Sequence, residues 1–475
     1  MTVATTIFAL STPPGRSAIA VVRISGPLAG EVLDAMCPPR AKPRFAALRK
    51  VQDPASRIIL DEALVIFFAS PQTETGEDML ELHLHGGKAV IAAVLAALAQ
   101  MPGLRPAEPG EFARRAFENG KLDLAQIEGL ADLIDAETEA QRRQGIAQAS
   151  GAQSKRFEGW RAQVLAALGL IEAAIDFSDE GDVSERAVAQ AEERVRGLAA
   201  ELARELADGH RGEILRDGFR VVLAGPPNAG KSSLLNALAR REAAIVSEEA
   251  GTTRDVIDVR LDLEGVAVIV SDTAGIRETS SNVEQEGIRR TLQAAREADL
   301  VVWLSEAATA ERAATPTPVP SPQGEDGRRL LVLTKSDLSL VQTIHVKQGS
   351  QGTEGLADAS PNRVRGLGPL AALGYDFAVS AKTGAGLDVL TAEIARRAKA
   401  AVGNASDPAL TRVRHRREIA LAAGHLDAFL IDPSRELELR AEDVRMAGMA
   451  LGRLTGRIDA EEVLGEIFTR FCIGK

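Results

Sequence analysis

The stretch Gly225-Pro-Pro-Asn-Ala-Gly-Lys-Ser-Ser233 restricts the fold of this chain more than any other segment. It matches G-x-x-x-x-G-K-[ST], a loop whose backbone N–H groups surround the phosphates of a nucleotide. An apolar run at 219–224 precedes the loop and a helix-forming run at 233–238 follows it, which is the strand–loop–helix order this motif needs. A Gly-rich turn without a ligand is a poor alternative in that context. We expect Lys231 to reach the β- and γ-phosphates and Ser232 to ligate magnesium.

Length and composition limit the class of protein. The chain has 475 residues, too many for one hydrophobic core, so we expect roughly two to four domains. Its two cysteines, Cys37 and Cys472, stand far apart and have no metal-binding spacing. No apolar run reaches the length of a membrane span, and no basic region precedes an apolar core at the N-terminus. We therefore expect a cytoplasmic protein that does not cross a membrane.

Charge is acidic overall but not uniformly so. The net charge of −11 argues against binding of nucleic acid through bulk charge. The segment 411–417 is locally basic, and it is either a solvated helix face or a contact surface for a partner.

Periodicity of apolar residues outlines the N-terminal half. Residues 1–118 read as mixed α/β, with strands expected at 19–24, 62–68 and 79–85 and a helix at 88–100. Helical periodicity with few breakers continues to about residue 210, with candidate helices at 123–148, 154–176 and 184–208.

The C-terminal half alternates strand and helix patterns from 216 to 398, as in a doubly wound, mostly parallel sheet. Two low-complexity insertions, near 309–328 and 339–370, interrupt this pattern. From 408 onwards the pattern is helical again. These last helices are expected to pack with the earlier ones, with the nucleotide-binding part inserted between them.

Three later motifs select guanine as the base. The aspartate of Asp272-Thr-Ala-Gly275 can hold magnesium through water, and its glycine N–H can meet the γ-phosphate. The aspartate of Thr334-Lys-Ser-Asp337 can accept hydrogen bonds from the ring N–H and the amine of guanine, a donor pair that adenine lacks. The backbone of Ser380-Ala-Lys382 can meet the guanine oxygen. Together these motifs, each at a strand end, predict GTP. Thr334 stands where Asn is usual, which predicts a weaker hold on the nucleotide.

The residues alone do not decide which group assists the attack of water on GTP. Ile276 stands where Ras-like enzymes carry a Gln that orients the attacking water. Isoleucine cannot orient water, so the role passes either to a cation placed against the phosphates or to an acidic side chain among Glu278, Glu284 and Glu286. Between the phosphate loop and Asp272, the segment Gly251-Thr-Thr-Arg-Asp255 carries threonines that can close over magnesium.

Several further motifs resemble the MnmE (TrmE) family of tRNA wobble-uridine modification GTPases over nearly the whole chain. They are Pro13-Pro-Gly-Arg-Ser-Ala-Ile-Ala-Val-Val-Arg-Ile-Ser-Gly26, Thr75-Gly-Glu-Asp-Met-Leu-Glu81, His85-Gly-Gly87, the run from Pro109 to Asp123, Asp272-Thr-Ala-Gly-Ile-Arg277 and the terminal Phe471-Cys-Ile-Gly-Lys475. This set is far more specific than any GTPase motif alone. One departure is Pro226, which stands where the family usually has arginine.

The resemblance implies a fold class of α/β plus α. It implies an N-terminal α/β domain (1–118) that binds folate and dimerises, a helical domain (119–215 with 400–475) and an inserted Ras-like P-loop GTPase domain (216–399). It further implies a homodimer that works with the flavoprotein MnmG, as a heterotetramer, on tRNA. The implied activity is potassium-dependent GTP hydrolysis that drives addition of a carboxymethylaminomethyl or aminomethyl group to C5 of the wobble uridine. The one-carbon donor is a tetrahydrofolate derivative, 5-formyl or 5,10-methylene.

Family roles carry over to matching positions. The folate positions are Arg23, Glu81, Lys121 and Lys475. Potassium is assigned to Asn228, Ser247, Glu249 and Thr252, and magnesium to Ser232 and Thr253. Glu284 matches the catalytic glutamate that positions the attacking water through a second water. The remaining nucleotide-binding positions are Ala229, Gly230, Lys231, Ser233, Glu248, Ala250, Gly251, Asp272, Thr273, Ala274, Gly275, Thr334, Lys335, Asp337, Ser380, Ala381 and Lys382.

A second function stays open at this point. Ribosome- or RNA-associated GTPase switches of the Era or Der type share the nucleotide motifs and have no modification activity. Era-type chains usually append a KH domain, which needs a G-x-x-G loop in a compact αβ unit, whereas the C-terminal segment here is expected to be helical. Residues 1–120 also have no counterpart in such chains. The basic segment 411–417 can serve tRNA or MnmG in the leading interpretation.

Overall fold

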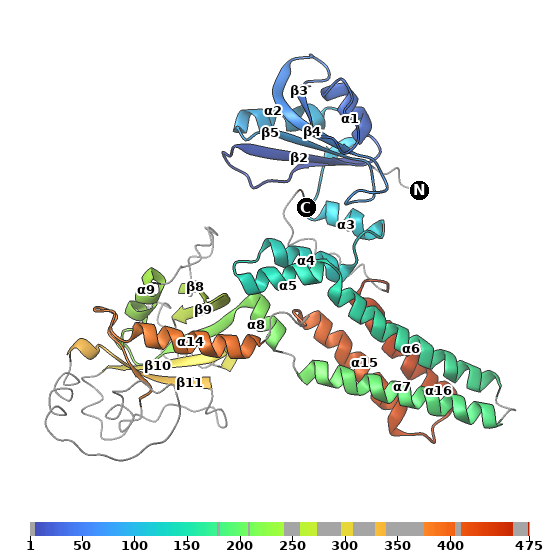
Figure 1. Cartoon of the computed structure of the whole chain (residues 1–475), viewed down its shortest axis with the longest axis vertical. Coiled ribbons are helices and arrows are strands. Elements are labelled where there is room, and N and C mark those ends of the chain that lie inside the picture. The colour runs from blue at the N-terminus through green and yellow to red at the C-terminus, as the bar shows by residue number, and fades with distance from the viewer. Residues whose placement is uncertain are drawn as a thin grey trace, which may run out of the picture. The chain divides into compact units, whose positions relative to one another are not determined.

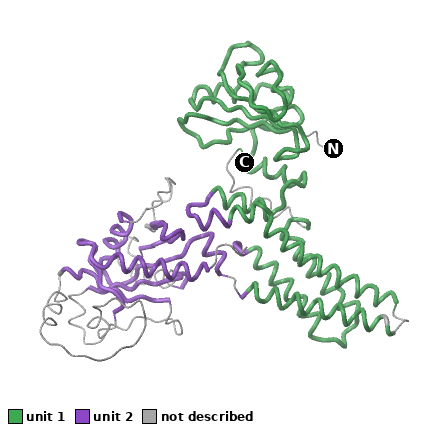
Figure 2. The backbone as a smooth tube through the Cα atoms, viewed as in Figure 1, with its two compact units in different colours: residues 1–134, 145–206, 414–475 green, residues 135–144, 207–413 purple. Residues whose placement is uncertain are grey.

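The computed structural model describes two compact units. Unit 1 comprises residues 1–134, 145–206 and 414–475, and unit 2 comprises residues 135–144 and 207–413 (Figure 2). The described residues are 5–177, 181–207, 210–241, 257–272, 296–306, 328–338, 375–403, 410–458 and 474. Within these ranges, none of the helices is long and apolar enough to span a bilayer. The three domain limits inferred from the sequence remain a prediction.

A six-stranded sheet with two covering helices forms the first part of unit 1 (Figure 1). Its elements are β1 (Thr6–Leu10), β2 (Ile19–Ser25), α1 (Ala29–Met36), β3 (Ala47–Gln52), β4 (Ile59–Phe68), β5 (Met79–His85), α2 (Lys88–Ala99), β6 (Leu104–Pro106) and α3 (Glu111–Glu118). The strand order is β3-β4-β5-β2-β1-β6, and every pair is antiparallel except β1 with β6. The strands and the helix expected here are confirmed.

Alternation along these strands separates two faces of the sheet. Val22, Leu82 and Val65 are fully or almost fully buried in one cluster with residues of α1 and α2. The alternate residues point to the opposite face. There Leu48 of β3 lies beside Leu64 of β4, and both are exposed. This second face also carries Arg23 and Glu81, which are paired across β2 and β5.

Long helices form the rest of unit 1: α4 (Leu124–Ile134), the end of α5 (Glu139–Ala149), α6 (Ala152–Asp176), α7 (Gly181–Ala207), α15 (Val413–Ile431) and α16 (Leu437–Leu454). The single helix expected over 123–148 is wrong, because α4 and α5 are separate. Thr138 starts α5 as an N-terminal cap: its hydroxyl faces the backbone N–H of Gln141, and the Gln141 side chain accepts from the N–H of Thr138 at 3.1 Å. Thr-x-x-Gln is a capping box, which the periodicity did not reveal.

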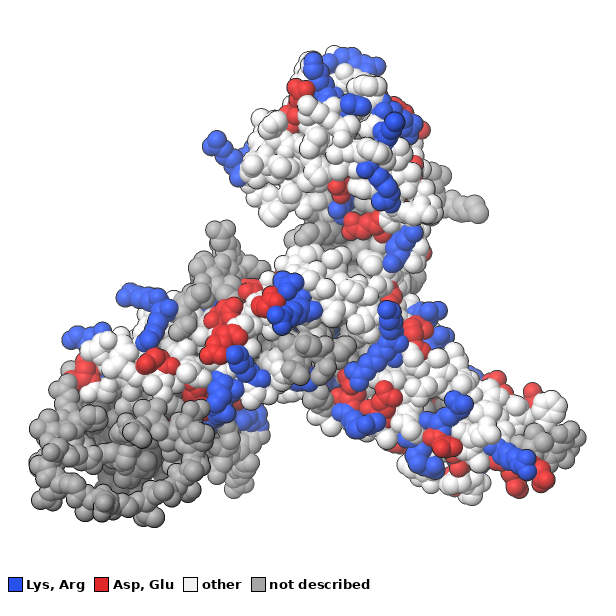
Figure 3. Space-filling model, viewed as in Figure 1, with Lys and Arg blue, Asp and Glu red and all other residues white. Residues whose placement is uncertain are grey.

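The basic segment 411–417 is tied into this helical part. Arg414 donates to both carboxylate oxygens of Glu128, and His415 lies 2.8 Å from one of them. Glu128 and His415 are almost fully buried. Arg414 also donates to the carbonyl of Arg453 at 2.9 Å, so one guanidinium joins α4, α15 and α16. The expectation of a solvated helix face is therefore wrong for these two residues. Elsewhere, on the face drawn in Figure 3, basic and acidic side chains alternate along the helices.

Unit 2 holds the second sheet. Its elements are α8 (Arg211–Asp217), β7 (Phe219–Ala224), α9 (Lys231–Arg241), β8 (Ile257–Leu263), β9 (Val266–Asp272), β10 (Leu300–Glu306), β11 (Arg329–Thr334), η2 (Ser336–Leu338), β12 (Phe377–Ala378) and α14 (Leu387–Val402). The strand order is β12-β11-β10-β7-β9-β8, parallel except at β8. This is the doubly wound, mostly parallel sheet expected from the sequence. The two low-complexity insertions lie almost wholly outside the described residues.

Replacement of Glu128 by alanine tests the buried cluster. The change removes the carboxylate that faces Arg414 and His415, so we expect the free energy of unfolding to fall by about 3–5 kcal/mol. The chain has two tryptophans, and Trp160 packs 5.7 Å from Phe157, whose ring lies 5.2 Å from His415. Urea unfolding followed by Trp160 fluorescence in a Trp303→Phe background therefore reports on this region.

The matched control for that experiment is Glu442→Ala on α16. Glu442 pairs with Arg445 where both side chains are about half exposed, at 54% and 48%. Exposed pairs contribute roughly 0–1 kcal/mol. Equal unfolding curves for Glu128→Ala and Glu442→Ala would contradict a stabilising role for the buried cluster.

Candidate functional site

The phosphate loop joins the end of β7 to the start of α9. Gly225 adopts φ +145°, and a Cβ atom there would lie 2.4 Å from the carbonyl oxygen of Leu304 on β10. Only glycine therefore allows this close approach of the loop to the neighbouring strand. The Lys231 ammonium donates to the carbonyls of Gly225 and Pro226 at 2.9 and 3.0 Å. The loop thus closes around the lysine that the sequence assigns to the phosphates.

Burial shapes the charge of this lysine. Lys231 is only 7% exposed, and desolvation lowers the pKa of its ammonium while the nearby Asp272 carboxylate opposes that shift. A buried ammonium loses stabilisation by water. An anionic ligand beside it, in addition to Asp272, therefore stabilises its positive charge.

The pairing of β7 with β9 brings together Ser232 and Asp272, the two described residues that were expected at the magnesium site. Leu223 of β7 pairs with Asp272 of β9, so both strands end at the same edge of the sheet. The Ser232 hydroxyl lies 2.5 Å from an Asp272 carboxylate oxygen. A hydroxyl and a carboxylate are the oxygen ligands that magnesium prefers, so these residues fit the ion. Thr253, the third assigned residue, lies outside the described residues.

Thr334 links the guanine motif to the phosphate loop. It ends β11 and is 4% exposed, and its hydroxyl lies 2.6 Å from the carbonyl of Ala229 and 3.2 Å from that of Ser305. A hydroxyl has one hydrogen, so the shorter contact is the stronger hydrogen bond. The residue that departs from the usual Asn therefore still connects the two motifs.

Asp337 is held in place by the third motif. The Ser380 hydroxyl donates to it at 2.7 Å, and this hydrogen bond is the main cause that keeps the Asp337 pKa below its usual range. The carboxylate is therefore an acceptor at neutral pH, as recognition of guanine requires. The sequence interpretation used only the backbone of Ser380, and the structure adds its side chain.

Glu306 is a functional candidate that the sequence interpretation missed. It ends β10, and it pairs with Lys335 of the guanine motif at 2.9 Å. The signal was available, because side chains at the carboxyl ends of neighbouring parallel strands gather at one edge of the sheet.

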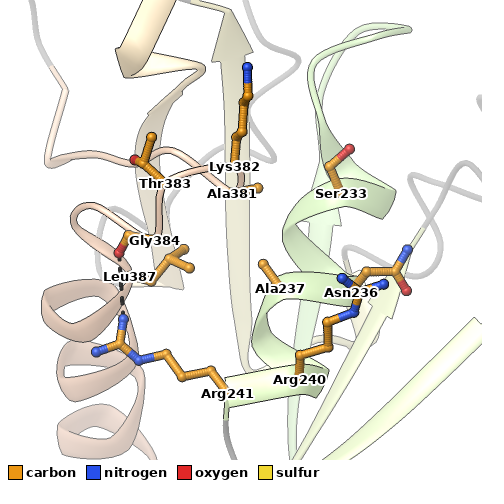
Figure 4. Close-up of a pocket in the computed structure, with 10 residues that line it drawn as sticks. All are labelled: Ser233, Asn236, Ala237, Arg240, Arg241, Ala381, Lys382, Thr383, Gly384 and Leu387. Atoms are coloured by element: carbon orange, nitrogen blue, oxygen red, sulfur yellow. Dashed lines mark hydrogen bonds between the residues drawn. The ribbon is translucent and has the colours of Figure 1, made fainter.

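A pocket of about 490 Å³ adjoins the guanine motifs (Figure 4). It lies between α9 and the loop that carries the third motif, and it is lined by Ser233, Asn236, Ala237, Arg240, Arg241, Ala381, Lys382, Thr383, Gly384 and Leu387. Figure 4 shows Lys382 and Ser233 at one end and the two arginine side chains at the other. The volume suits a small ligand, and three of the lining residues were predicted nucleotide contacts. Asn236, Arg240 and Arg241 were not predicted.

Part of the predicted nucleotide set cannot be placed. Ser247, Glu248, Glu249, Ala250, Gly251, Thr252 and Thr253, together with Thr273, Ala274, Gly275 and Glu284, lie outside the described residues.

A second cluster of predicted site residues lies on the N-terminal sheet. Arg23 and Glu81 are direct partners across β2 and β5. Two N–H groups of Arg23 donate to one oxygen of Glu81, at 3.2 and 3.1 Å. Arg23 also pairs with Glu74 at 2.9 Å, and His83 lies 3.1 Å from the other oxygen of Glu81. Glu74 and His83 were not predicted.

Lys121 and the chain end approach this cluster. A Cβ atom on Gly76 would lie 3.2 Å from the Lys121 side chain, so Lys121 packs beside the loop that carries Glu74. The Ser11 hydroxyl, just after β1, donates to the carbonyl of Gly474 at 3.0 Å. Because β1 pairs with β2, the described end of the chain lies next to the strand of Arg23. Lys475 lies outside the described residues.

Family models match both parts of the chain. The model described as "GTP-binding protein TrmE N-terminus" matches residues 6–121. The model described as "MnmE helical domain" matches residues 124–472.

Curated relatives match it end to end, under the name "tRNA modification GTPase MnmE". The protein from Parvibaculum lavamentivorans is 48% identical over 99% of this chain and 100% of its own length. The one from Azorhizobium caulinodans is 48% identical over 99% of each chain, and the one from Caulobacter vibrioides is 47% identical over 99% of each chain.

Thr334→Val tests the bond between the guanine motif and the phosphate loop. The variant leaves the Ala229 carbonyl without this donor, so we expect nucleotide affinity to fall by about 10-fold, with Thr334→Ser close to the wild type. Titration calorimetry with GDP measures both. Equal affinity of Thr334→Val and the wild type would show that the hydroxyl does not support the loop.

Proposed function

Because this chain belongs to the MnmE (TrmE) family of tRNA modification GTPases, we propose that it acts on C5 of the tRNA wobble uridine. GTP hydrolysis drives the addition of a carboxymethylaminomethyl or aminomethyl group, and the flavoprotein MnmG is its partner in a heterotetramer. The end-to-end match to curated relatives supports this reading. The cytoplasm, where tRNA is modified, is the proposed location.

The one-carbon unit comes from a tetrahydrofolate derivative, 5-formyl or 5,10-methylene. A carboxylate such as Glu81 accepts from the adjacent N–H groups of a pteridine ring, while Arg23, Lys121 and Lys475 suit the carboxylates of the glutamate tail. The single observation that carries the proposal is that residue 474 lies against the strand next to Arg23, a separation of 463 residues from Ser11. That contact supports the proposal that residues from both ends of the chain contribute to the folate set.

Magnesium and potassium complete the nucleotide site. Ser232 and Thr253 would hold magnesium, and the ion would supply positive charge beside the phosphates. Asn228, with Ser247, Glu249 and Thr252, would hold potassium. Asn228 supports that role because it is exposed in the phosphate loop and adopts φ +63°, a conformation that asparagine tolerates better than most residues.

Two groups replace the Gln that Ile276 cannot supply. A potassium ion held by Asn228 would supply positive charge beside the phosphates, and Glu284 would position the attacking water through a second water. Glu284 lies outside the described residues, so its assignment depends on the family resemblance alone.

A homodimer forms through the N-terminal sheet. The face opposite α1 and α2 exposes Leu48, Leu64, Ile19 and Ile59, at 58%, 46%, 57% and 54%. Exposed apolar side chains that neighbour one another on adjacent strands favour association with a second copy.

An RNA-associated GTPase switch of the Era or Der type is the alternative function. The match of residues 6–121 to the TrmE N-terminal model favours modification over this alternative.

Mass analysis of tRNA nucleosides tests the proposed function. Cells that lack the protein should lose the 5-substituted wobble uridines, and the wild-type chain should restore them. Lys231→Ala should not restore them, because it removes the cation that faces the phosphates. Identical nucleosides with and without the protein would favour the switch instead.

Asn228→Ala tests the potassium site. Wild-type GTP turnover should rise roughly 10-fold or more when potassium replaces sodium or choline at equal ionic strength. The variant should bind GTP almost normally and lose this stimulation, because one ion ligand is gone. Wild-type rates that are equal in all three salts would reject the cation role.

A further inference from the structure

Lys335 has a backbone conformation that few lysines adopt. It follows β11 in the guanine motif, and its φ of +56° lies in the left-handed region. Residues other than glycine rarely occupy that region, and they remain in it where the surrounding structure fixes them. The placement of Lys335 is therefore set by its neighbours in the fold and not by local backbone preference.

The residues before and after Lys335 are bonded to other parts of the nucleotide site. The Thr334 hydroxyl lies 2.6 Å from the carbonyl of Ala229 in the phosphate loop. The N–H of Ser336 donates to the carbonyl of Val379, just after β12, at 3.3 Å. These two bonds hold the backbone on either side of Lys335, and neither involves its side chain.

Glu306 holds the side chain of Lys335. Pairing of β10 with β11 places Glu306 opposite Thr334, one residue before the lysine. The Lys335 ammonium donates to the Glu306 carboxylate at 2.9 Å, and the two side chains are 35% and 30% exposed. Within the part of the chain that the structure describes, no other carboxylate is bonded to this ammonium. The flexible four-carbon stem of Lys335 is thus held at both ends.

A lysine stem held in this way suits the face of a purine ring. Such stems cover apolar surface while their charged ends stay in water. Asp337, oriented by the Ser380 hydroxyl at 2.7 Å, is expected to accept from the edge of guanine. A base whose edge meets Asp337 turns a ring face towards the other side chains of the motif. Lys335 has the only long apolar stem among the four residues 334–337.

We infer that Glu306 is a positioning residue of the guanine site, which orders the Lys335 side chain before the base arrives. Immobilising a long side chain during binding lowers affinity, and a side chain that is already ordered avoids that cost. A partly exposed ion pair contributes little to the stability of the fold. The effect of Glu306 therefore appears in nucleotide affinity. This role requires only the binding of a guanine nucleotide, so it depends on neither folate nor potassium.

Titration calorimetry of the full-length chain with GDP tests the inference. Glu306→Ala should lower the affinity by about 5-fold, which corresponds to the cost of ordering one long side chain. Glu306→Gln keeps the size of the side chain and removes its charge, so it should also lower the affinity. Circular dichroism checks that each variant is folded. Equal affinity of both variants and the wild type would overturn the role of Glu306.

The same substitution in a Lys335→Ala background shows whether Glu306 acts through the lysine. There Glu306→Ala should cause no further loss, because the group that it positions is gone. An equal loss in both backgrounds would mean that Glu306 acts in another way, and it would reject the inference.

Glu393→Ala is the matched control for removal of an ion pair from the same unit. Glu393 on α14 bonds to Arg396 at 2.7 Å and to Arg397 at 2.8 Å, and its side chain is 20% exposed. This variant should keep the wild-type affinity for GDP. A loss as large as that of Glu306→Ala would show a general effect of losing an ion pair, which contradicts a specific role for Glu306.

Inosine diphosphate (IDP) separates an effect on Lys335 from an effect on Asp337. IDP lacks the exocyclic amine of guanine but has the same ring face. Glu306→Ala should therefore weaken GDP and IDP by the same factor. A greater loss for GDP would place the effect on Asp337 and overturn the inference. If the wild type binds neither nucleotide, the nucleotide site itself fails, whatever the nucleoside analysis of tRNA shows.

Discussion

Parallel pairing of β7 with β9 and β10, and of β10 with β11, is the constraint on which the nucleotide site depends. In a parallel sheet every strand delivers its carboxyl end to the same edge. Leu223 is paired with Asp272 and Glu306 with Thr334, so the carboxyl ends of four strands from distant parts of the chain meet there. The bond from Thr334 to Ala229 spans 105 residues of sequence. The phosphate loop is thus shaped by strands that follow it, as the approach of Gly225 to Leu304 also shows.

The N-terminal cluster is assembled by a different rule. Antiparallel pairing places Arg23 of β2 directly across from Glu81 of β5, and period-two alternation sends both side chains to the open face. Opposite charges that face each other on a sheet stabilise the register and remain accessible to solvent. Such a surface holds its charges in place without burying them, and this makes it suitable for a ligand that carries both donors and carboxylates.

Local motifs were predictable because their chemistry lies within a few residues. The phosphate loop, the aspartate of β9 and the guanine motif all appear where the sequence placed them, since each follows a short apolar strand. The break between α4 and α5 was also local, but periodicity hides it and only the capping pair Thr138 and Gln141 reveals it. Prediction of the ion pair between Glu306 and Lys335 would have required the order of the strands in the sheet. No short segment of the sequence specifies that order.

Strand, loop and helix identities, and with them the nucleotide chemistry, follow from residue order in short windows, because backbone preference and motif spacing are local properties. Contacts between residues far apart in the sequence were decided only by the tertiary structure. Contact of Arg414 and His415 with Glu128 ties two residues of the basic segment into the helical part, and contact between Ser11 and Gly474 joins the two ends of the described chain. Charge and hydroxyl groups have many possible partners along 475 residues, and packing of the folded chain selects among them.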